Sequence, residues 1–558
     1  MTPAIFFHPD GYFTGGKEVV GRQAAGESFL RGILSYSTAS EICIQVPKAR
    51  QAEQFKELMT GLGLDRPVQF VDRENLGQLA TVGGCYHPGP DLALLSRERC
   101  GFGDAAWSIT GVTHTTATLR VMDELTQIIT APVQPWDALI CTSTAVKANV
   151  ERVMQGEVDR LKDRLGIQKL VLPRLPVIPL GIHPDDFVFS GDDRVAARQA
   201  VGASNKTHVV LYLGRLSFHA KANPFAMYRA FELAAQDLPA GEEILLIECG
   251  WHANDGQKDA FDKAAKLAAP SIRTLTLDGR DAKIRRKAWA AADVFCSLSD
   301  NIQETFGITP IEAMVAGLPV VVSDWDGYKE TVRDGIDGFR VPTMMPAAGL
   351  GADLALRHGL ELDTYDMYCG QVSSLIAVDI ERTAAAFSKL FSSEELRRQM
   401  GAAGRERARE VYDWKHIIPQ YEALWAELDA VRKADGPKLA PAAVPWPARP
   451  DPFLAFAAYP SGLLGDETVL ELVPPSAGAA MDQVRSYLTL FLVNYTPRVI
   501  PAESEIRHIL AIAEAGPSPA LALVYGLSED RRAFAFRGLA WLVKIGVLRV
   551  RAFHARNE

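Results

Sequence analysis

Two glutamates stand close together in the segment NIQETFGITPIEAMVAGLPVVVS, residues 301–323. Glu304 precedes Thr-Phe-Gly, and Glu312 follows Thr309-Pro310. One interpretation is structural: Thr309 caps a helix, Pro310 takes its first position, and Glu312 closes a capping box. The other is chemical, because a glycine-bearing loop that enters a helix presents free amides to an anion. Carboxylates beside that anion accept hydrogen bonds from hydroxyl groups, so the two glutamates would straddle a nucleotide sugar.

Two cationic residues follow an earlier strand. The stretch VVLYLGRLSFHAKANP places Gly214, Arg215 and Lys221 directly after apolar residues. Ligands of open α/β sheets bind at the carboxyl ends of the strands. Arginine can hold a phosphate with two hydrogen bonds, and lysine supplies a point charge. The alternative is a solvated pair on a surface loop.

Short apolar strands alternate with helices along most of the chain. AIFFH, EICIQVP and PVQFVD belong to a first series, and THVVLYLG, EILLIECG and DVFCSLS belong to a second series that begins near residue 207. This alternation predicts two α/β halves, each with a mostly parallel sheet covered on both faces.

The pattern also predicts the domain organisation. Six prolines within 437–452 indicate a semi-rigid linker. In chain order we expect an α/β domain at 1–187, a second α/β domain at 188–410 with an irregular insertion at about 343–375, a helix at 411–436 that crosses back to the first domain, the linker at 437–452 and a mainly helical domain at 453–558.

The last 106 residues, 453–558, form a separate unit in this interpretation. The run LAWLVKIGVLRV resembles the final helix and wing of winged-helix domains. Ten basic residues are balanced by ten acidic ones in this segment, whereas nucleic-acid-binding domains are usually basic. We therefore expect a docking or dimerisation module there and no nucleic-acid partner.

Composition is that of an ordinary globular protein of 558 residues, with 48% hydrophobic residues, mean hydropathy +0.00 and a net charge of -9. The acidic balance argues against a broad nucleic-acid surface. The amino terminus lacks a signal-peptide pattern, and no apolar segment is long enough to span a bilayer. The seven cysteines show no CxxC spacing and predict buried thiols in a reducing cytoplasm. Peripheral contact with the inner face of the membrane stays open.

Three motifs together resemble one enzyme family. VIPLGIHPDDF, GRLSFHAK and DVFCSLSDNIQETFGITPIEAMVAGLPVVVSDWDGYKETVRDGIDGF are similar to segments of the retaining glycosyltransferases of family 4, the glycosyl transferases group 1, over about 430 positions. The resemblance implies the GT-B fold, an α/β class in which two Rossmann-like domains face each other across a cleft. Residues 1–187 would form the acceptor domain and 188–410 the nucleotide-sugar donor domain.

The resemblance also implies roles for matching residues in the second half. Arg215 and Lys221 would hold the donor diphosphate, Glu304 would bind hydroxyls of the transferred sugar, and Glu312 would bind the ribose. Backbone amides around three residues would meet the sugar and phosphate: Phe306, Gly307 and Ile308. One departure is Ala222, since the family usually has Lys-Gly in this turn.

Further positions match in the same way. Gly15 and Gly16 resemble the family's Gly-Gly loop near the phosphates, although a generic turn is the alternative. His114, in ITGVTHTTAT, matches a histidine that faces the sugar, although a lone histidine is often only a satisfied polar residue. Arg280, in LDGRDAK, lies where the family contacts the base.

The implied activity is transfer of a hexosyl group with retention of anomeric configuration, without a metal ion or other cofactor, in polysaccharide, lipopolysaccharide or other glycoconjugate synthesis. The leaving phosphate would take the proton of an acceptor that attacks from the same face. A GT-B epimerase or phosphorylase is one rival. Another is a non-catalytic scaffold that binds nucleotide sugars and acts through its carboxyl-terminal domain. The donor base (UDP, GDP or ADP), the sugar and the saccharide, lipid-linked or protein acceptor stay open.

Overall fold

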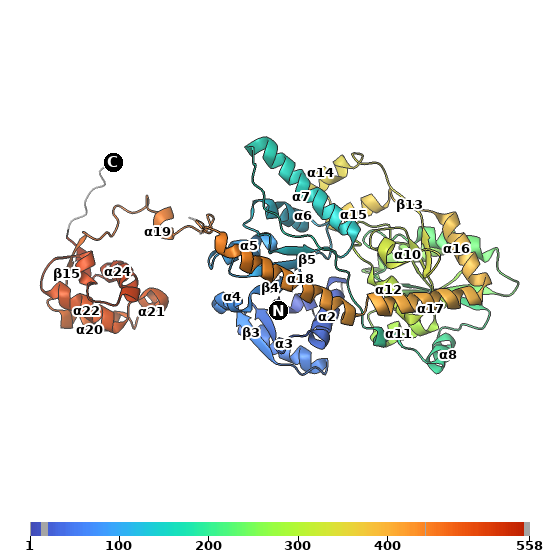
Figure 1. Cartoon of the computed structure of the whole chain (residues 1–558), viewed down its shortest axis with the longest axis horizontal. Coiled ribbons are helices and arrows are strands. Elements are labelled where there is room, and N and C mark those ends of the chain that lie inside the picture. The colour runs from blue at the N-terminus through green and yellow to red at the C-terminus, as the bar shows by residue number, and fades with distance from the viewer. Residues whose placement is uncertain (1, 13–20, 441, 443, 552–558) are drawn as a thin grey trace. The chain divides into compact units, whose positions relative to one another are not determined.

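A computed structural model describes residues 2–12, 21–440, 442 and 444–551. The chain separates into two compact units, Met1–Trp446 and Pro447–Glu558 (Figure 1). The division falls within the proline-rich segment. Each unit is described by itself below.

The first half of the larger unit is built on a six-stranded parallel sheet in the order β3-β2-β1-β4-β5-β6. Alternate residues enter apolar cores on opposite faces, with Ile5 on one face and Ala4 on the other. The strands are β1 (Ala4–Phe6), β2 (Ile42–Val46), β3 (Val68–Asp72), β4 (Gly84–His87), β5 (Ser108–Val112) and β6 (Ala138–Ile140). The helices are α1 (Pro9–Tyr12), α2 (Gly21–Tyr36), α3 (Ala49–Gly61), α4 (Leu79–Val82), α5 (Leu92–Cys100), α6 (Leu119–Gln127) and α7 (Thr144–Leu165).

The second half repeats this design. Its parallel sheet has the order β12-β11-β10-β7-β8-β9, which is the same winding as in the first sheet. The strands are β7 (Thr207–Leu213), β8 (Glu243–Gly250), β9 (Arg273–Asp278), β10 (Val294–Ser297), β11 (Val320–Ser323) and β12 (Gly338–Val341). The helices are α8 (Gly191–Ala200), α9 (Phe225–Ala235), α10 (Asp255–Ala268), α11 (Ala282–Ala291), α12 (Ile308–Ala316), α13 (Tyr328–Thr331), α16 (Ile380–Ser392) and α17 (Glu394–Val411).

The strand order locates the place where each sheet can bind a ligand. In both sheets the winding reverses direction next to the first strand, between β1 and β4 and between β7 and β10. Loops that leave neighbouring strands in opposite directions open a crevice at such a switch point, on the carboxyl side of the sheet. The expected fold, two Rossmann-like halves of GT-B type with a helical carboxyl-terminal region, is confirmed.

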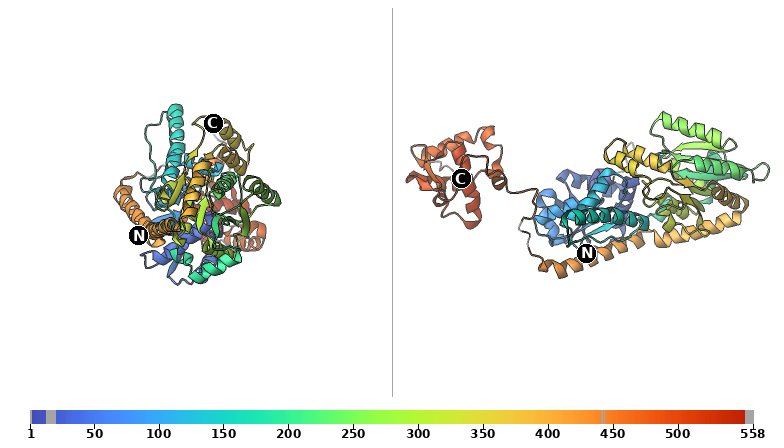
Figure 2. Two further views of the ribbon diagram at one scale, coloured as in Figure 1. Left: turned by 90° about the vertical axis from the view of Figure 1, so that its right-hand side faces the viewer. Right: turned by 90° about the horizontal axis from the view of Figure 1, so that it is seen from above.

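The chain crosses between the halves twice at one place. Ile182 pairs with Asp413, and the next residue, Trp414, starts α18 (Trp414–Asp435). Trp414 is fully buried in the core of the first half and donates from its indole N–H to the Ser28 hydroxyl at 2.8 Å. Figure 2 shows α17 and α18 following one another along the unit. The second crossing therefore ties the end of the second half to the first core.

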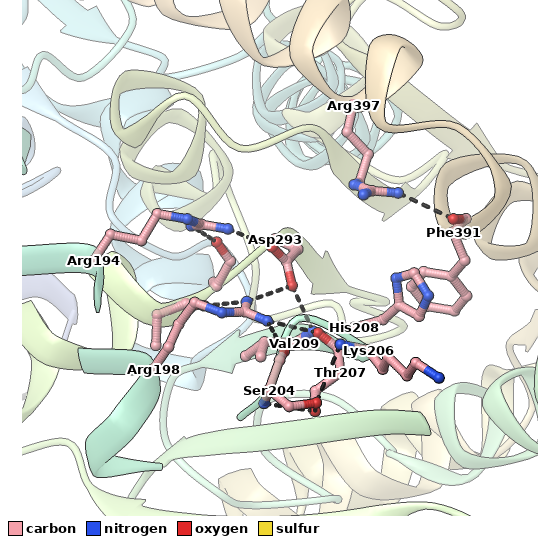
Figure 3. Close-up of polar contacts among 12 residues, drawn as sticks. Arg194, Arg198, Ser204, Lys206, Thr207, His208, Val209, Asp293, Phe391 and Arg397 are labelled. Atoms are coloured by element: carbon pink, nitrogen blue, oxygen red, sulfur yellow. Dashed lines mark hydrogen bonds and ion pairs between the residues drawn. The ribbon is translucent and has the colours of Figure 1, made fainter. Parts of the chain in front are cut away.

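The amino-terminal edge of the second sheet holds a compact charged cluster (Figure 3). The Asp293 carboxylate, just before β10, accepts hydrogen bonds from Arg194, from Arg198 at 2.8 Å and from the backbone N–H of Val209 at 2.8 Å. Arg198 also donates to the carbonyl oxygen of Thr207 at 2.8 Å. This Asp293 cluster fastens α8 to the start of β7 and lies at the opposite end of the strands from the switch point.

The smaller unit has its own apolar core. In it, β15 (Val469–Leu472) pairs in antiparallel fashion with β16 (Ser518–Pro519) and β17 (Leu548–Val550). Its helices are α19 (Pro452–Ala455), α20 (Ala477–Tyr487), α21 (Phe491–Asn494), α22 (Glu503–Glu514), α23 (Ala520–Leu523) and α24 (Glu529–Lys544).

All seven cysteines are buried and unpaired. Burial raises the pKa of the Cys43 and Cys85 thiols to about 12 and that of Cys249 to about 11. Within the described ranges, no helix combines the length and the apolar character that a bilayer span requires.

Candidate functional site

The loop after β7, residues 214–224, is called the phosphate turn below. It lies directly on β8, because a side chain at Gly250 would place its Cβ 1.9 Å from the carbonyl oxygen of Gly214. Within the turn, the backbone N–H of Lys221 donates to the carbonyl oxygen of Ser217 at 3.0 Å. The turn is therefore held at the carboxyl end of the sheet, where the sequence predicts it.

Lys221 and Glu304 meet at the switch point of the second sheet. The Lys221 Nζ lies 2.5 Å from a Glu304 carboxylate oxygen, and the two side chains are only 24% and 10% exposed. Burial alone would raise the pKa of Glu304. The Lys221 charge and backbone N–H donors from Thr305 and Phe306 outweigh burial and hold that pKa below its ordinary value. Glu304 is thus an ionised acceptor at neutral pH.

Arg215 lies on the other side of the same loop. One of its guanidinium nitrogens donates to the Ala220 carbonyl oxygen at 2.9 Å and to the Gln303 side-chain oxygen at 3.2 Å. Neither partner is anionic, so the Arg215 charge is available to a ligand. Arg215 and Lys221 together carry two positive charges beside Glu304.

The helix α12 begins with Gly307 as its N-cap, and no side chain caps it. Gly307 has φ of 75°, and a Cβ there would lie 1.8 Å from the Tyr328 ring. Only glycine fits this position. The prediction that Thr309 caps the helix is wrong, because the helix starts at Ile308, one residue before Thr309. Its first amides are left for an anion.

Glu312 occupies the first turns of α12 and is half-buried. It makes no hydrogen bond with any described residue of the chain. Burial raises the pKa of Glu312 to about 7, although the Arg285 charge acts in the opposite direction. A buried carboxyl group without a protein partner is suited to accept hydrogen bonds from hydroxyl groups of a ligand.

Two arginines that follow β9 behave differently. Arg280, the residue expected to contact the base, is exposed and pairs with Asp278 at 2.7 Å. Arg285 is half-buried, donates to the Gly279 carbonyl oxygen at 2.7 Å and is the cation whose charge reaches Glu312. Arg285 is not among the residues predicted from the sequence, although its place in the first turn of a helix after β9 was a usable signal.

Two further side chains hold the site together and were also missed. Asn301, fully buried, donates to the His219 carbonyl oxygen at 3.0 Å and accepts from the Gln303 amide at 3.0 Å. Asp300 accepts from the Asn223 amide at 3.2 Å, and burial raises its pKa to about 7. Both join the phosphate turn to the Glu304 loop. Their polar character inside DVFCSLSDN was the only sequence signal.

Loops from the first sheet contact the Glu304 loop directly. The Thr305 hydroxyl donates to the carbonyl oxygen of His114 at 3.2 Å, and the Ser143 hydroxyl donates to the carbonyl oxygen of Thr305 at 3.0 Å. His114 follows β5 and is half-buried. The structure therefore brings His114 to the same place as Thr305, the neighbour of Glu304.

The start of α7 is a second point of contact. Ser143 caps this helix and donates to Asp326 at 3.0 Å, and the Thr144 amide donates to Glu330 at 2.6 Å. Both carboxylates belong to the second half. Burial, with the neighbouring charge of Glu304, raises the pKa of Asp326 to about 8. The helix amides favour the negative charge of Glu330 and fasten the two halves together.

The remaining predicted residues are placed as follows. Phe306 is buried against Tyr412 and contributes its backbone. Gly15 and Gly16 lie outside the described residues. Within the described part of the chain, no group of three or more histidine, cysteine, aspartate or glutamate residues could hold a metal ion.

Part of the chain is similar in sequence to known proteins. Residues 193–349 match the family of glycosyl transferases group 1. A D-inositol 3-phosphate glycosyltransferase of Geodermatophilus obscurus is 26% identical over 286 residues, which cover 50% of this chain and 60% of that protein. A phosphatidyl-myo-inositol mannosyltransferase of Mycobacterium tuberculosis is 31% identical over 170 residues, 30% of this chain and 40% of that protein. The matches thus span less than two thirds of these relatives.

Solved structures show a similar fold. The crystal structure of HepE from Anabaena in complex with UDP has a TM-score of 0.50 at 14% identity, covering 76% of this chain and all of that one. A glycosyltransferase from Rickettsia africae has a TM-score of 0.50 at 11% identity, covering 76% of this chain and 98% of that one. At these identities the likeness concerns the fold alone.

Proposed function

We propose that this chain, whose residues 193–349 match the glycosyl transferases group 1 and whose fold is of GT-B type, transfers a hexosyl group from a nucleoside diphosphate sugar to an acceptor hydroxyl, with retention of anomeric configuration. One observation carries the proposal. Lys221, Arg215 and the uncapped start of α12 converge on the switch point of the second sheet, beside the ionised Glu304.

The diphosphate is the first part of the donor to be placed. When the sugar–phosphate bond breaks, the diphosphate leaves with the electron pair of that bond and gains negative charge. Arg215 and the first α12 amides already lie there, Lys221 lies beside them in its pair with Glu304, and together they would stabilise this charge. Because these groups supply the positive charge, we propose that no divalent metal is needed. Activity that persists in excess EDTA would support this.

The carboxylates would hold the two sugars. Glu304, ionised at neutral pH, would accept hydrogen bonds from the transferred sugar, while Lys221 turns toward the phosphate. Glu312 would accept hydrogen bonds from the ribose, and Arg285 lies on the same side for the base. His114 and the loop after β5 would face the sugar from the first half.

The acceptor oxygen then bonds to the anomeric carbon from the face that the phosphate leaves. Its proton passes to the leaving phosphate oxygen, so no separate base is required. We place the reaction in the cytoplasm, because the seven unpaired thiols suit a reducing compartment. Two relatives named for inositol acceptors, and HepE named as a UDP complex, support a glycoconjugate role and a nucleotide donor.

A panel of sugar nucleotides tests the proposal. Calorimetry with UDP, GDP and ADP should show that one binds best. The sugar esters of that nucleotide, with and without a cell extract as acceptor source, should then release the nucleoside diphosphate. Binding of a nucleotide without turnover of any ester would instead favour a non-catalytic scaffold. Binding of none of the three would contradict the proposal.

A further inference from the structure

The insertion in the second half begins and ends at the same place on the domain. It leaves the domain at β13 (Thr343–Met344) and returns at β14 (Ala377–Val378), and these two short strands pair with each other. Between them lie α14 (Ala352–Gly359) and α15 (Tyr365–Ser373). Because the ends of the insertion are joined, α14 and α15 are held near one place on the domain.

Helix α15 packs on the phosphate turn. Gly370 is buried, and a Cβ there would lie 2.8 Å from the Cβ of His219, so the helix backbone touches the turn. Asp366 lies 3.8 Å from the His219 ring nitrogen. The charge of Arg215 also reaches the thiol of Cys369, a buried residue of the same helix. The insertion is therefore next to the proposed diphosphate-binding residues.

The same helix reaches the first half. The Tyr365 hydroxyl lies 3.4 Å from the Thr115 hydroxyl. Thr115 is the neighbour of His114, whose carbonyl oxygen accepts from Thr305 at 3.2 Å. The His114 loop is thus held from two sides, by Thr305 of the Glu304 loop and by Tyr365 of the insertion.

We infer that α15 forms the wall of the site on the side of the transferred sugar. In this arrangement Tyr365 is a positioning residue, because its hydroxyl orders the His114 loop. This rests on the proposed function. At 3.4 Å the contact between the two hydroxyls is longer than a good O–H···O hydrogen bond, so it should shorten when the loop closes over a sugar. Tyr365 would then distinguish the sugar nucleotide from the nucleotide alone.

Single hydroxyl deletions test this in the full chain. Tyr365→Phe should raise hydrogen exchange at residues 113–116 in the ligand-free protein by about twofold, the low end for a single hydrogen bond, because the contact is long there. Affinity for UDP, GDP or ADP, whichever binds the wild type, should stay within about twofold. Turnover of its glucose and mannose esters should fall about fivefold in kcat, because only the sugar depends on the loop.

A matched control lies one turn along α15. Tyr368 stacks on His358, with ring centroids 4.1 Å apart, and makes no contact with Thr115 that the structure shows. Tyr368→Phe should leave loop exchange and turnover unchanged. Thr115→Val should reproduce Tyr365→Phe, Thr115→Ser should restore wild-type values, and the Thr115→Val, Tyr365→Phe double variant should be no worse than either single one.

The outcomes separate the two proposals. If Tyr365→Phe and Tyr368→Phe behave alike in exchange and in turnover, the positioning role of Tyr365 is overturned. If the wild type binds none of the three nucleotides, the proposed function fails, and the exchange comparison alone decides whether Tyr365 orders the His114 loop.

Discussion

Two charged clusters lie at opposite ends of the second sheet and differ in one respect. At the amino-terminal edge, Asp293 receives two arginines and a backbone amide from its own domain (Figure 3). At the carboxyl edge, Arg215 has only neutral partners and Glu312 has no hydrogen bond among the described residues. The charged groups of the first cluster are paired with one another without a ligand. In the second cluster, Arg215 and Glu312 are charged groups that the described residues do not pair. Buried charges that the fold satisfies hold the structure, and those that it leaves unsatisfied indicate a binding site.

The largest effect should follow removal of charge at the carboxyl edge. Lys221→Met should lower kcat/KM for the donor by about 10²–10³-fold, because a preorganised cation no longer meets the leaving diphosphate. Lys258→Met is the control, since Lys258 forms an exposed pair with Asp262 on α10. Release of nucleoside diphosphate measures both.

Loss of Lys221 also leaves Glu304 without its partner. The double variant Lys221→Met, Glu304→Gln removes that unpaired charge and should recover stability without recovering activity. Near-wild-type turnover in Lys221→Met would overturn the comparison between the clusters.

The Asp293 cluster should show the opposite signature. Asp293→Ala leaves Arg194, Arg198 and the Val209 amide without their acceptor and should cost about 2–4 kcal/mol of stability. Turnover per folded molecule should change by less than about threefold, because no ligand group is touched. Chemical denaturation and turnover at low temperature measure the two quantities. A large loss of turnover with unchanged stability would contradict a structural role.

Glu312 allows a test by pH. Its carboxyl group ionises near pH 4.5 in the ordinary state and near pH 7 in the folded chain. The folded form therefore loses stability relative to the unfolded form as pH rises from 4.5 to 7. Glu312→Gln removes this loss. Between pH 5 and pH 8 the free energy of unfolding of the variant should therefore exceed that of the wild type by about 1–3 kcal/mol.

The same substitution should weaken nucleotide binding by about tenfold, because hydrogen bonds to a charged group are lost. Melting curves across pH and calorimetry with the best-binding nucleotide measure the two effects. Glu312 would be purely structural if the variant were less stable at pH 8 and bound nucleotide normally.

A smaller effect is expected from a hydroxyl group that the first half contributes to the contact between the halves. Ser143→Ala removes both the cap of α7 and the contact with Asp326. Ser190→Ala is matched, since Ser190 caps α8 and has no partner among the described residues of the first half. Each should cost about 1 kcal/mol of stability.

Only Ser143→Ala should also lower turnover, by about three- to tenfold, because it loosens the contact between the halves. Equal turnover in the two variants would show that the contact between Ser143 and Asp326 does not contribute to catalysis.

The smallest effect is expected from the carboxyl-terminal unit. A chain ending at residue 446 retains both sheets and every residue of the candidate site, and residues 447–558 have a separate core. Donor affinity and turnover should stay within about twofold of the full chain. A larger loss would show that the smaller unit acts on the site.

Much of this could be predicted from residue patterns, because strand–helix alternation determines parallel sheets and motif spacing determines which loops meet. The exceptions depend on partners distant in sequence. The helix starts after Gly307 because the Tyr328 ring fills the space beside it, and no local pattern shows that. The charge of Arg285 acts on Glu312, which lies 27 residues later in the chain. The contact of Tyr365 with Thr115 joins residues 250 apart.

The buried thiols offer a practical consequence. All seven cysteines are buried in the folded chain. A maleimide can therefore label each cysteine only after the segment that covers it unfolds. Cys369 is a buried residue of α15, while Cys249 and Cys296 belong to β8 and β10 of the second sheet. Labelling at Cys369 ahead of the other two would time the departure of the insertion separately from global unfolding, and the native chain needs no engineered probe for that measurement.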